Sequence, residues 1–209
     1  MKFESIIFDV DGTLWDSRAL LAGAYNEQLR EENIDLVVDE NMLKPLFGRT
    51  MTALADGLFP MISAPERYGL MDRCIVKMDE HLEKYAGPQI GYPELRSTME
   101  ALAKNHRLFI VSNGQSGYPQ MAAKKLGLED LIDGYLSFGD TGKSKGQTLK
   151  ILMEQHNIRD AAYVGDTQGD LEATQEAGMA FIWTSFGFGT PERFDLRVDK
   201  FSDLKNLEE

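Results

Sequence analysis

The stretch Ser5-Ile-Ile-Phe-Asp-Val-Asp-Gly-Thr13 decides the fold. Its first six residues are almost continuously apolar and rich in β-branched side chains, and the run breaks at Gly12. A strand that is buried on both faces has this composition, and such strands occur in parallel sheets covered by helices on both sides. We therefore expect a parallel α/β sheet whose first strand leads into two aspartates, Asp9 and Asp11.

Three later runs resemble the first one and predict further buried strands: Leu108–Ser112, Ala161–Val164 and Ala180–Trp183. Helical patterns lie between them. Pro119 is suited to begin one helix and Gly127 to end it, and Gly178 is suited to end another. Strands that alternate with helices predict a doubly wound, Rossmann-like α/β fold.

Residues 16–87 interrupt this alternation, because they contain no convincing strand. Apolar residues recur there at helical spacing in three stripes: Leu21, Tyr25 and Leu29; Met51, Leu54 and Leu58; and Met71, Cys74, Ile75, Met78 and Leu82. The pattern predicts an inserted helical domain over 16–87. The α/β core is then made of 1–15 and 88–209, and Gly87-Pro88 marks the return to it.

Composition narrows the class of protein. The chain has 209 residues, of which 43% are hydrophobic and 27% charged, as in ordinary globular domains. Its net charge of −12 disfavours nucleic acid and anionic membranes as partners. A single cysteine, Cys74, and the lack of an export signal or of ~18 consecutive apolar residues lead us to expect a cytoplasmic protein. The sequence does not reveal the oligomeric state.

Polar residues gather where the predicted strands end, which is where ligands bind in open α/β sheets. They comprise Asp9, Asp11 and Thr13 after the first run, Ser112 and Asn113 after the second, and Asp166 and Asp170 after the third. A pair of lysines, Lys143 and Lys145, lies just before a predicted helix. In a parallel sheet these segments converge on one crevice.

The residue types in this crevice suit phosphoryl transfer. Carboxylate oxygens without His or Cys favour Mg²⁺ over zinc, whereas hydroxyl, amide and ammonium groups bind phosphate oxygens. A free aspartate titrates near pH ~3.9, so Asp9 can be an ionised nucleophile. Asp11 can donate a proton to the leaving oxygen and later deprotonate water, if its surroundings raise its pKa.

Four motifs now carry a resemblance to a known family. Taken in order, they are Asp9-Val-Asp-Gly-Thr-Leu-Trp-Asp-Ser17, Val111-Ser-Asn-Gly114, a lysine, and Val164-Gly-Asp-Thr-Gln-Gly-Asp170. This order resembles the haloacid dehalogenase superfamily of hydrolases. The helical insertion is similar to the α-helical cap of the phosphoglycolate phosphatase-like branch.

The resemblance implies a role for each motif. Asp9 would be the nucleophile and Asp11 the acid and base, while Thr13 would orient the first loop. Ser112 and Asn113 would bind phosphate. The implied Mg²⁺ site consists of Asp9, the main-chain carbonyl of Asp11, and Asp166, with Asp170 in support.

The motif lysine is ambiguous, because neither Lys143 nor Lys145 is followed by the proline that many relatives have. Lys145-Gly-Gln-Thr-Leu149 resembles a known variant of the motif, which favours Lys145 as the catalytic lysine and leaves Lys143 as the alternative. Arg49, together with Trp15 and Arg18, is a candidate for contacting the substrate.

These observations predict a Mg²⁺-dependent phosphatase that hydrolyses a small phosphorylated metabolite through an aspartyl-phosphate on Asp9. An acid at the Asp11 position disfavours a true dehalogenase. Two alternatives stay open. A phosphosugar mutase of the same superfamily keeps both aspartates, and a non-catalytic binding protein could keep the fold.

Overall fold

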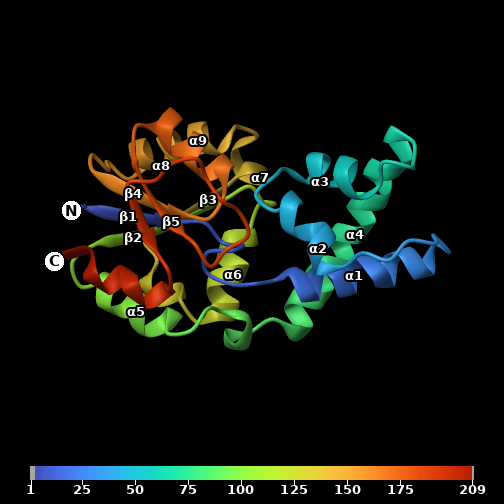
Figure 1. Ribbon diagram of the computed structural model, residues 1–209, viewed down its shortest axis with the longest axis horizontal. Coiled ribbons are helices and arrows are strands. Elements are labelled where there is room, and N and C mark those ends of the chain that lie inside the picture. The colour runs from blue at the N-terminus through green and yellow to red at the C-terminus, as the bar shows by residue number, and fades with distance from the viewer. Residues whose placement is uncertain (1–2, 209) are drawn as a thin grey trace.

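The computed structural model of the protein describes residues 3–208 (Figure 1). Its sheet has six parallel strands in the order β3-β2-β1-β4-β5-β6. Their bounds are β1 Ser5–Phe8, β2 Arg107–Ser112, β3 Gly134–Ser137, β4 Ala161–Gly165, β5 Ala180–Thr184 and β6 Leu196–Val198. The central strand β1 pairs Phe8 with Ile110 on one side and with Val164 on the other. The carboxyl ends of three strands therefore lie level.

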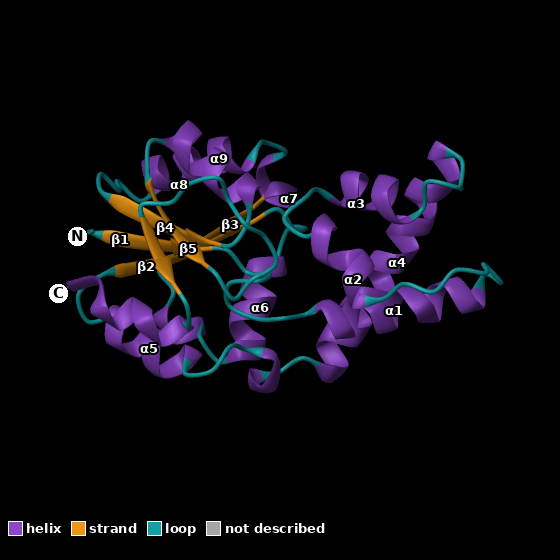
Figure 2. Cartoon of the chain, in the orientation of Figure 1, coloured by secondary structure: helices purple, strands orange, loops and turns teal. Residues whose placement is uncertain are grey.

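Helices cover both faces of this sheet, as Figure 2 shows. The helices of the core are α5 Leu95–Leu102, α6 Tyr118–Leu126, α7 Phe138–Thr141, α8 Lys145–Gln155 and α9 Gln168–Ala177, with 3₁₀ helices over Glu129–Leu131 and Phe201–Glu208. Side chains of β1 alternate between the two faces. Ile7 packs in one hydrophobic cluster with Leu149 and Leu171 of α8 and α9, whereas Ile6 packs in the other with Met99 of α5. This arrangement confirms the doubly wound α/β fold.

A helical unit lies beyond the carboxyl ends of the strands (Figure 1). It contains α1 Arg18–Glu31, α2 Glu40–Leu43, α3 Met51–Leu58 and α4 Ala64–Tyr85, with short 3₁₀ helices over Lys44–Leu46 and Pro88–Ile90. None of residues 16–87, all of which the structure describes, is in a strand. The three predicted stripes lie on α1, α3 and α4 and are largely buried, and Cys74 is part of this packing.

Two chain segments connect the helical unit to the core, and they run side by side. The Asp16 amide donates to the Ile90 carbonyl at 2.9 Å, and the Tyr92 amide donates to the Leu14 carbonyl at 3.1 Å. Trp15 lies between these bonds, in an isolated bridge with Gly91. The outgoing and returning connections are thus joined by backbone hydrogen bonds.

The structure differs from the sequence-based expectation in the number of strands. β3 and β6 were not predicted, because both are short and most of their residues are partly buried or exposed. The first strand also ends at Phe8 rather than at Val10. Among residues 3–208, no helix is long and apolar enough to cross a lipid bilayer.

Candidate active site

Three buried carboxylates meet at the carboxyl ends of β1 and β4. Asp9 follows β1, Asp166 follows β4, and Asp170 lies in the first turn of α9. One oxygen from each lies within 4.8 Å of the others. Gly12 permits this approach, since its φ is +80° and an added Cβ would lie 2.2 Å from an Asp166 oxygen.

Lys145 supplies the positive charge at this cluster. Its Nζ lies 3.0 Å from Asp9 Oδ1 and 2.6 Å from Asp170 Oδ1, and the side chain is buried. The residue begins α8, whose N-terminus is capped because Ser144 Oγ accepts from the Gln147 amide. Lys143, two residues earlier, is exposed.

Burial raises the pKa of the carboxylates, and the charge of Lys145 lowers it, so the three residues differ in the direction of their pKa shift. Burial raises the pKa of Asp9 to about 7, although Lys145 opposes the rise. Burial also raises the pKa of Asp166, and the charges of Asp170 and Asp9 add to the effect. For Asp170 the penalty of burial is outweighed by Lys145, so its pKa falls below the usual range.

Asp166 provides a direct test of whether a cation fits here. Its Oδ2 accepts from the Phe188 amide at 2.6 Å, but its Oδ1 is buried without a hydrogen-bond partner within the described part of the chain. Buried polar atoms normally have a hydrogen-bond partner, so an unpaired oxygen here indicates a binding position for a ligand such as a cation. Three converging carboxylates without nitrogen or sulfur donors fit Mg²⁺.

The loop after β5 closes one side of this cluster. A Cβ on Gly187 would lie 2.3 Å from the Asp166 Cβ and 2.5 Å from the Gly12 carbonyl oxygen. From sequence this segment, Gly187-Phe-Gly189, is interpreted as an ordinary turn. The structure shows in addition that this segment packs directly on Asp166. Two glycines a few residues after a predicted strand were the signal available in the sequence.

Asp11 is not part of the three-carboxylate cluster, and its own carboxylate accepts from three side-chain donors. Trp15 Nε1 donates to it at 2.9 Å, Ser17 Oγ at 2.5 Å, and the Tyr118 hydroxyl at 2.8 Å. Burial nevertheless raises its pKa. Trp15, a candidate for contacting substrate, is fully buried, donates to Asp11 and does not line the pocket described below. Sequence reasoning assigned no role to Ser17 or Tyr118.

The predicted phosphate-binding residues lie at the end of β2. Ser112 is buried, and its Oγ accepts from the Gly114 amide at 3.1 Å. The side chain of Asn113 donates to the carbonyl of Gly48, so it links the core to the helical unit. Thr13 is buried next to Asp11, and its hydroxyl has no partner among the residues described.

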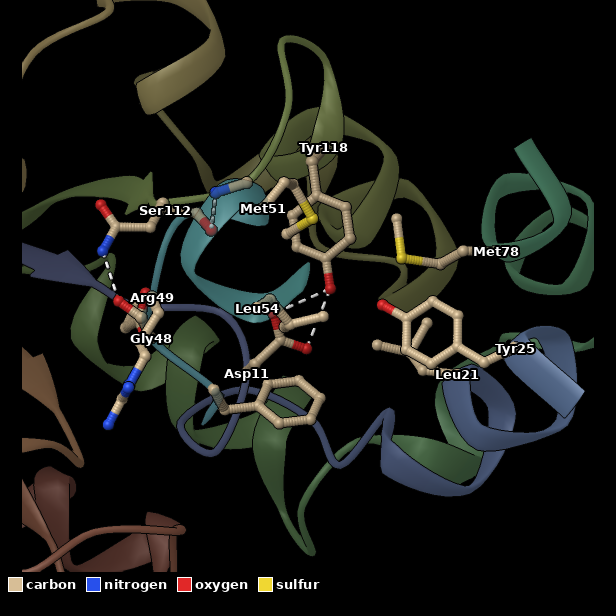
Figure 3. Close-up of a pocket in the computed structure, with 14 residues that line it drawn as sticks. Asp11, Leu21, Tyr25, Gly48, Arg49, Met51, Leu54, Met78, Ser112 and Tyr118 are labelled. Atoms are coloured by element: carbon tan, nitrogen blue, oxygen red, sulfur yellow. Dashed lines mark hydrogen bonds between the residues drawn. The ribbon is translucent and has the colours of Figure 1, made fainter. Parts of the chain in front are cut away.

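A pocket opens between these residues and the helical unit (Figure 3). It encloses about 40 Å³, and Asp9, Asp11, Ser112 and Asn113 line its core side. Arg49 lines it too and is exposed. Arg18 does not line it and instead pairs with Asp16 at 2.7 Å, with its guanidinium over the Phe188 ring.

Residues 6–184 match the family described as haloacid dehalogenase-like hydrolase. The chain belongs to this family. A protein named phosphoglycolate phosphatase from Aquifex aeolicus is 32% identical over 97% of this chain and 95% of its own length. An N-acetylmuramic acid 6-phosphate phosphatase from Pseudomonas aeruginosa is 24% identical over 92% of this chain and 86% of its own.

Solved structures of haloacid dehalogenase-like proteins share the fold. One from Haemophilus somnus, described as a predicted phosphoglycolate phosphatase, superposes with a TM-score of 0.89 at 22% identity, over 100% of this chain and 99% of its own. The β-phosphoglucomutase of Clostridium difficile superposes with a TM-score of 0.78 at 15% identity, over 97% and 93%. These likenesses concern the fold alone.

The structure brings the motif residues of this haloacid dehalogenase-like hydrolase into one place. Asp9, Asp166 and Asp170 form the buried cluster, and Lys145 bridges two of them. Lys143 stays outside it. A buried carboxylate beside a lysine, with a second carboxyl group nearby, can form and then hydrolyse an acyl phosphate.

Proposed function

We propose that this hydrolase is a Mg²⁺-dependent phosphatase that cleaves a small phosphorylated metabolite through an aspartyl-phosphate on Asp9, with residues 16–87 as its cap. The observation that carries the proposal is the buried cluster of Asp9, Asp166 and Asp170 with its unpaired Asp166 oxygen. The phosphatase names of the relatives support the same reaction class. The single cysteine supports a cytoplasmic setting.

In this proposal Asp9, Asp166 and the Asp11 main-chain carbonyl would hold the metal, and Asp170 would support the site. When bound, Mg²⁺ would offset the negative charge of the carboxylates and of the phosphate oxygens. Asp170 itself is already engaged, because it accepts from Lys145, from the Thr167 hydroxyl and from two backbone amides. Those bonds fix its carboxylate in one orientation.

In the first step a carboxylate oxygen of Asp9 attacks the phosphorus atom. A bond forms between Asp9 and phosphorus as the ester P–O bond breaks, and the leaving oxygen takes a proton from Asp11. The raised pKa of Asp11 makes its protonated form available for this role. Lys145, which lies 3.0 Å from Asp9, would steady its charge, and Ser112 and Asn113, which line the pocket, would contact the phosphate oxygens.

In the second step the same groups act in reverse roles. Asp11, now ionised, takes a proton from a water molecule, whose oxygen attacks the phosphorus. The bond between phosphorus and Asp9 breaks, which releases inorganic phosphate and restores the carboxylate. The cap over the pocket limits the access of other water during this step.

Hydrolysis of p-nitrophenyl phosphate tests the proposal. We expect release with Mg²⁺, loss of release with EDTA, and loss in Asp9→Asn. Asp199→Asn, an exposed aspartate of the core, is the matched control and should keep its activity. Activity that survives both EDTA and Asp9→Asn would contradict the mechanism, and lack of release from any ester would favour a non-catalytic protein.

The mutase alternative is separated by its product. The C. difficile protein of the same fold is named a β-phosphoglucomutase. Incubation with a hexose 1-phosphate should therefore be followed for hexose 6-phosphate as well as for inorganic phosphate. Our proposal expects inorganic phosphate; accumulation of the 6-phosphate without it would establish a mutase.

A further inference from the structure

The cap side of the pocket differs in character from its core side. The apolar wall there is made by side chains of α1, α3 and α4 and of the segment before α3: Leu21, Tyr25, Phe47, Met51, Leu54 and Met78. All are uncharged, and all except Met51 are buried. Whatever is esterified to the phosphate must lie against this wall, because the core side is taken by the reacting groups.

Arg49 is the one cation among the described residues that line this pocket. It is exposed, and Figure 3 shows its side chain directed away from Leu21, Tyr25 and Met78. A carboxylate placed against the wall would lose its hydration without gaining a positive partner, which is costly in an apolar site. The wall therefore disfavours a negatively charged leaving group.

Tyr25 carries the one polar atom of the wall. Its side chain is fully buried, and its hydroxyl finds no hydrogen-bond partner in residues 3–208. In Figure 3 this hydroxyl points toward the part of the pocket where Tyr118 and Asp11 lie. A buried hydroxyl without a partner that faces a pocket is suited to donate to an acceptor on a ligand.

We propose that the substrate is a phosphate ester of a small, uncharged and mainly apolar alcohol that has one hydrogen-bond acceptor for Tyr25. This inference rests on the proposed phosphatase function and adds the chemical class of the leaving group to it. The proposed substrate differs from the one in the name of the Aquifex relative, because phosphoglycolate has a carboxylate in the leaving group.

Three esters with equal numbers of non-hydrogen atoms test the proposal: hydroxyacetone phosphate, isobutyl phosphate and phosphoglycolate. The part of each ester that would face the wall is a neutral carbonyl in hydroxyacetone phosphate, an alkyl group without an acceptor in isobutyl phosphate, and a carboxylate in phosphoglycolate. Phosphate release with Mg²⁺ gives kcat/KM for each. We expect hydroxyacetone phosphate to exceed phosphoglycolate by at least about tenfold, because the carboxylate stays unpaired.

Ratios between esters within each variant separate recognition from intrinsic reactivity, because the reactivity of each ester cancels when the ratio is compared between variants. Tyr25→Phe should lower the preference for hydroxyacetone phosphate over isobutyl phosphate by about threefold to tenfold, the usual effect of one hydrogen bond. It should leave the ratio of isobutyl phosphate to p-nitrophenyl phosphate unchanged, which a merely loosened cap would not.

A lysine in the wall should reverse the charge selection. Met78→Lys should raise the relative use of phosphoglycolate by at least about tenfold, since the ammonium supplies the missing partner. Val76→Lys is the matched control on the same helix, because Val76 is 58% exposed. Met51→Lys, at a half-buried position of the wall, gives a second variant that tolerates a charge should Met78→Lys not fold.

The outcomes distinguish this inference from the function on which it rests. No release from any ester, p-nitrophenyl phosphate included, would overturn both. Release from p-nitrophenyl phosphate, together with a higher kcat/KM for phosphoglycolate than for hydroxyacetone phosphate, would overturn the inference alone. Ratios that neither lysine variant changes would also overturn it.

Discussion

The Tyr118 hydroxyl lies 2.9 Å and 2.8 Å from the two carboxylate oxygens of Asp11 and donates to that carboxylate. The two residues are 107 positions apart in the chain, and they meet because α6 begins at the carboxyl end of β2. The proposed acid and base is therefore oriented by a helix of the core, in addition to Trp15 and Ser17 of its own segment.

Tyr118→Phe should reduce kcat and shift its pH dependence. Losing one donor is expected to lower kcat on an alkyl phosphate by about threefold to tenfold, and by less on p-nitrophenyl phosphate, which needs little help from an acid. The hydroxyl lowers the pKa of Asp11, so its removal raises that pKa and moves the alkaline limb of kcat to higher pH. Tyr85→Phe on α4 is the control. An unchanged pH profile would argue against this role.

Lys145→Met and Lys143→Met form a matched pair two residues apart. We expect Lys145→Met to lower kcat by about 10²–10³-fold, because the charge beside Asp9 is lost from a buried site. Its melting temperature should also fall, since two carboxylates lose their partner. Lys143→Met should resemble the wild type in both measurements. Comparable losses in the two variants would refute our assignment of Lys145.

The metal-free protein should lose stability as the pH rises. The pKa of Asp9 is about 7 in the folded state against 3.8 unfolded, so its stabilising contribution is full below about 3.8 and is lost as the pH approaches about 7. Asp166 acts in the same direction. Thermal melting in EDTA should give a lower midpoint at about pH 8 than at about pH 5, and Mg²⁺ should restore it.

Asp9→Asn is the diagnostic variant for that pH dependence, because its amide cannot ionise. We expect a smaller difference between the two pH values in this variant, and the full difference in Asp199→Asn. A midpoint in EDTA that stays constant or increases over this range would show that the buried carboxylates do not control stability there.

Gly187→Ala and Gly169→Ala should have opposite effects. The added methyl at position 187 collides with Asp166 and with the Gly12 carbonyl, and we expect a loss of about 1–3 kcal/mol and weaker Mg²⁺ binding. At position 169, within α9, the nearest atom would be 3.6 Å away, and alanine should stabilise the helix by up to about 1 kcal/mol. Urea unfolding and Mg²⁺ titration of activity measure both.

Much of the fold could be predicted because buried parallel strands have a composition of their own. β1, β2, β4 and β5 are buried along almost their whole length, and each is a compact apolar run. β3 and β6 lie at the edges of the sheet, where partial exposure permits ordinary loop composition. The edges were therefore missed for a physical reason.

The residues of the candidate site likewise fall into those that the sequence predicted and those that it did not. Motif spacing and strand ends indicated Asp9, Asp166 and Asp170 as neighbours, because parallel strands bring their carboxyl ends together. The resemblance favoured Lys145 over Lys143 but left Lys143 as an alternative, because only the first turn of α8 decides which side chain points inward. The sequence around Tyr118 and Tyr25 gave no sign that these residues belong to the site, because their contacts depend on how distant elements pack.

Trp15 serves two structures at once. Its backbone joins the outgoing and returning connections of the cap through the bridge with Gly91, and its indole holds Asp11. If the cap rotated about these connections, it would shift a residue that orients the proposed proton donor, Asp11. We expect a substrate that is small enough for the cap to close over it to bring Asp11 into position. With an oversized ester bound at Asp9 the cap would stay open, and proton transfer from Asp11 would be slow. The enzyme would then select substrates by size in two ways: through the space in the pocket and through the rate of proton transfer to the leaving oxygen.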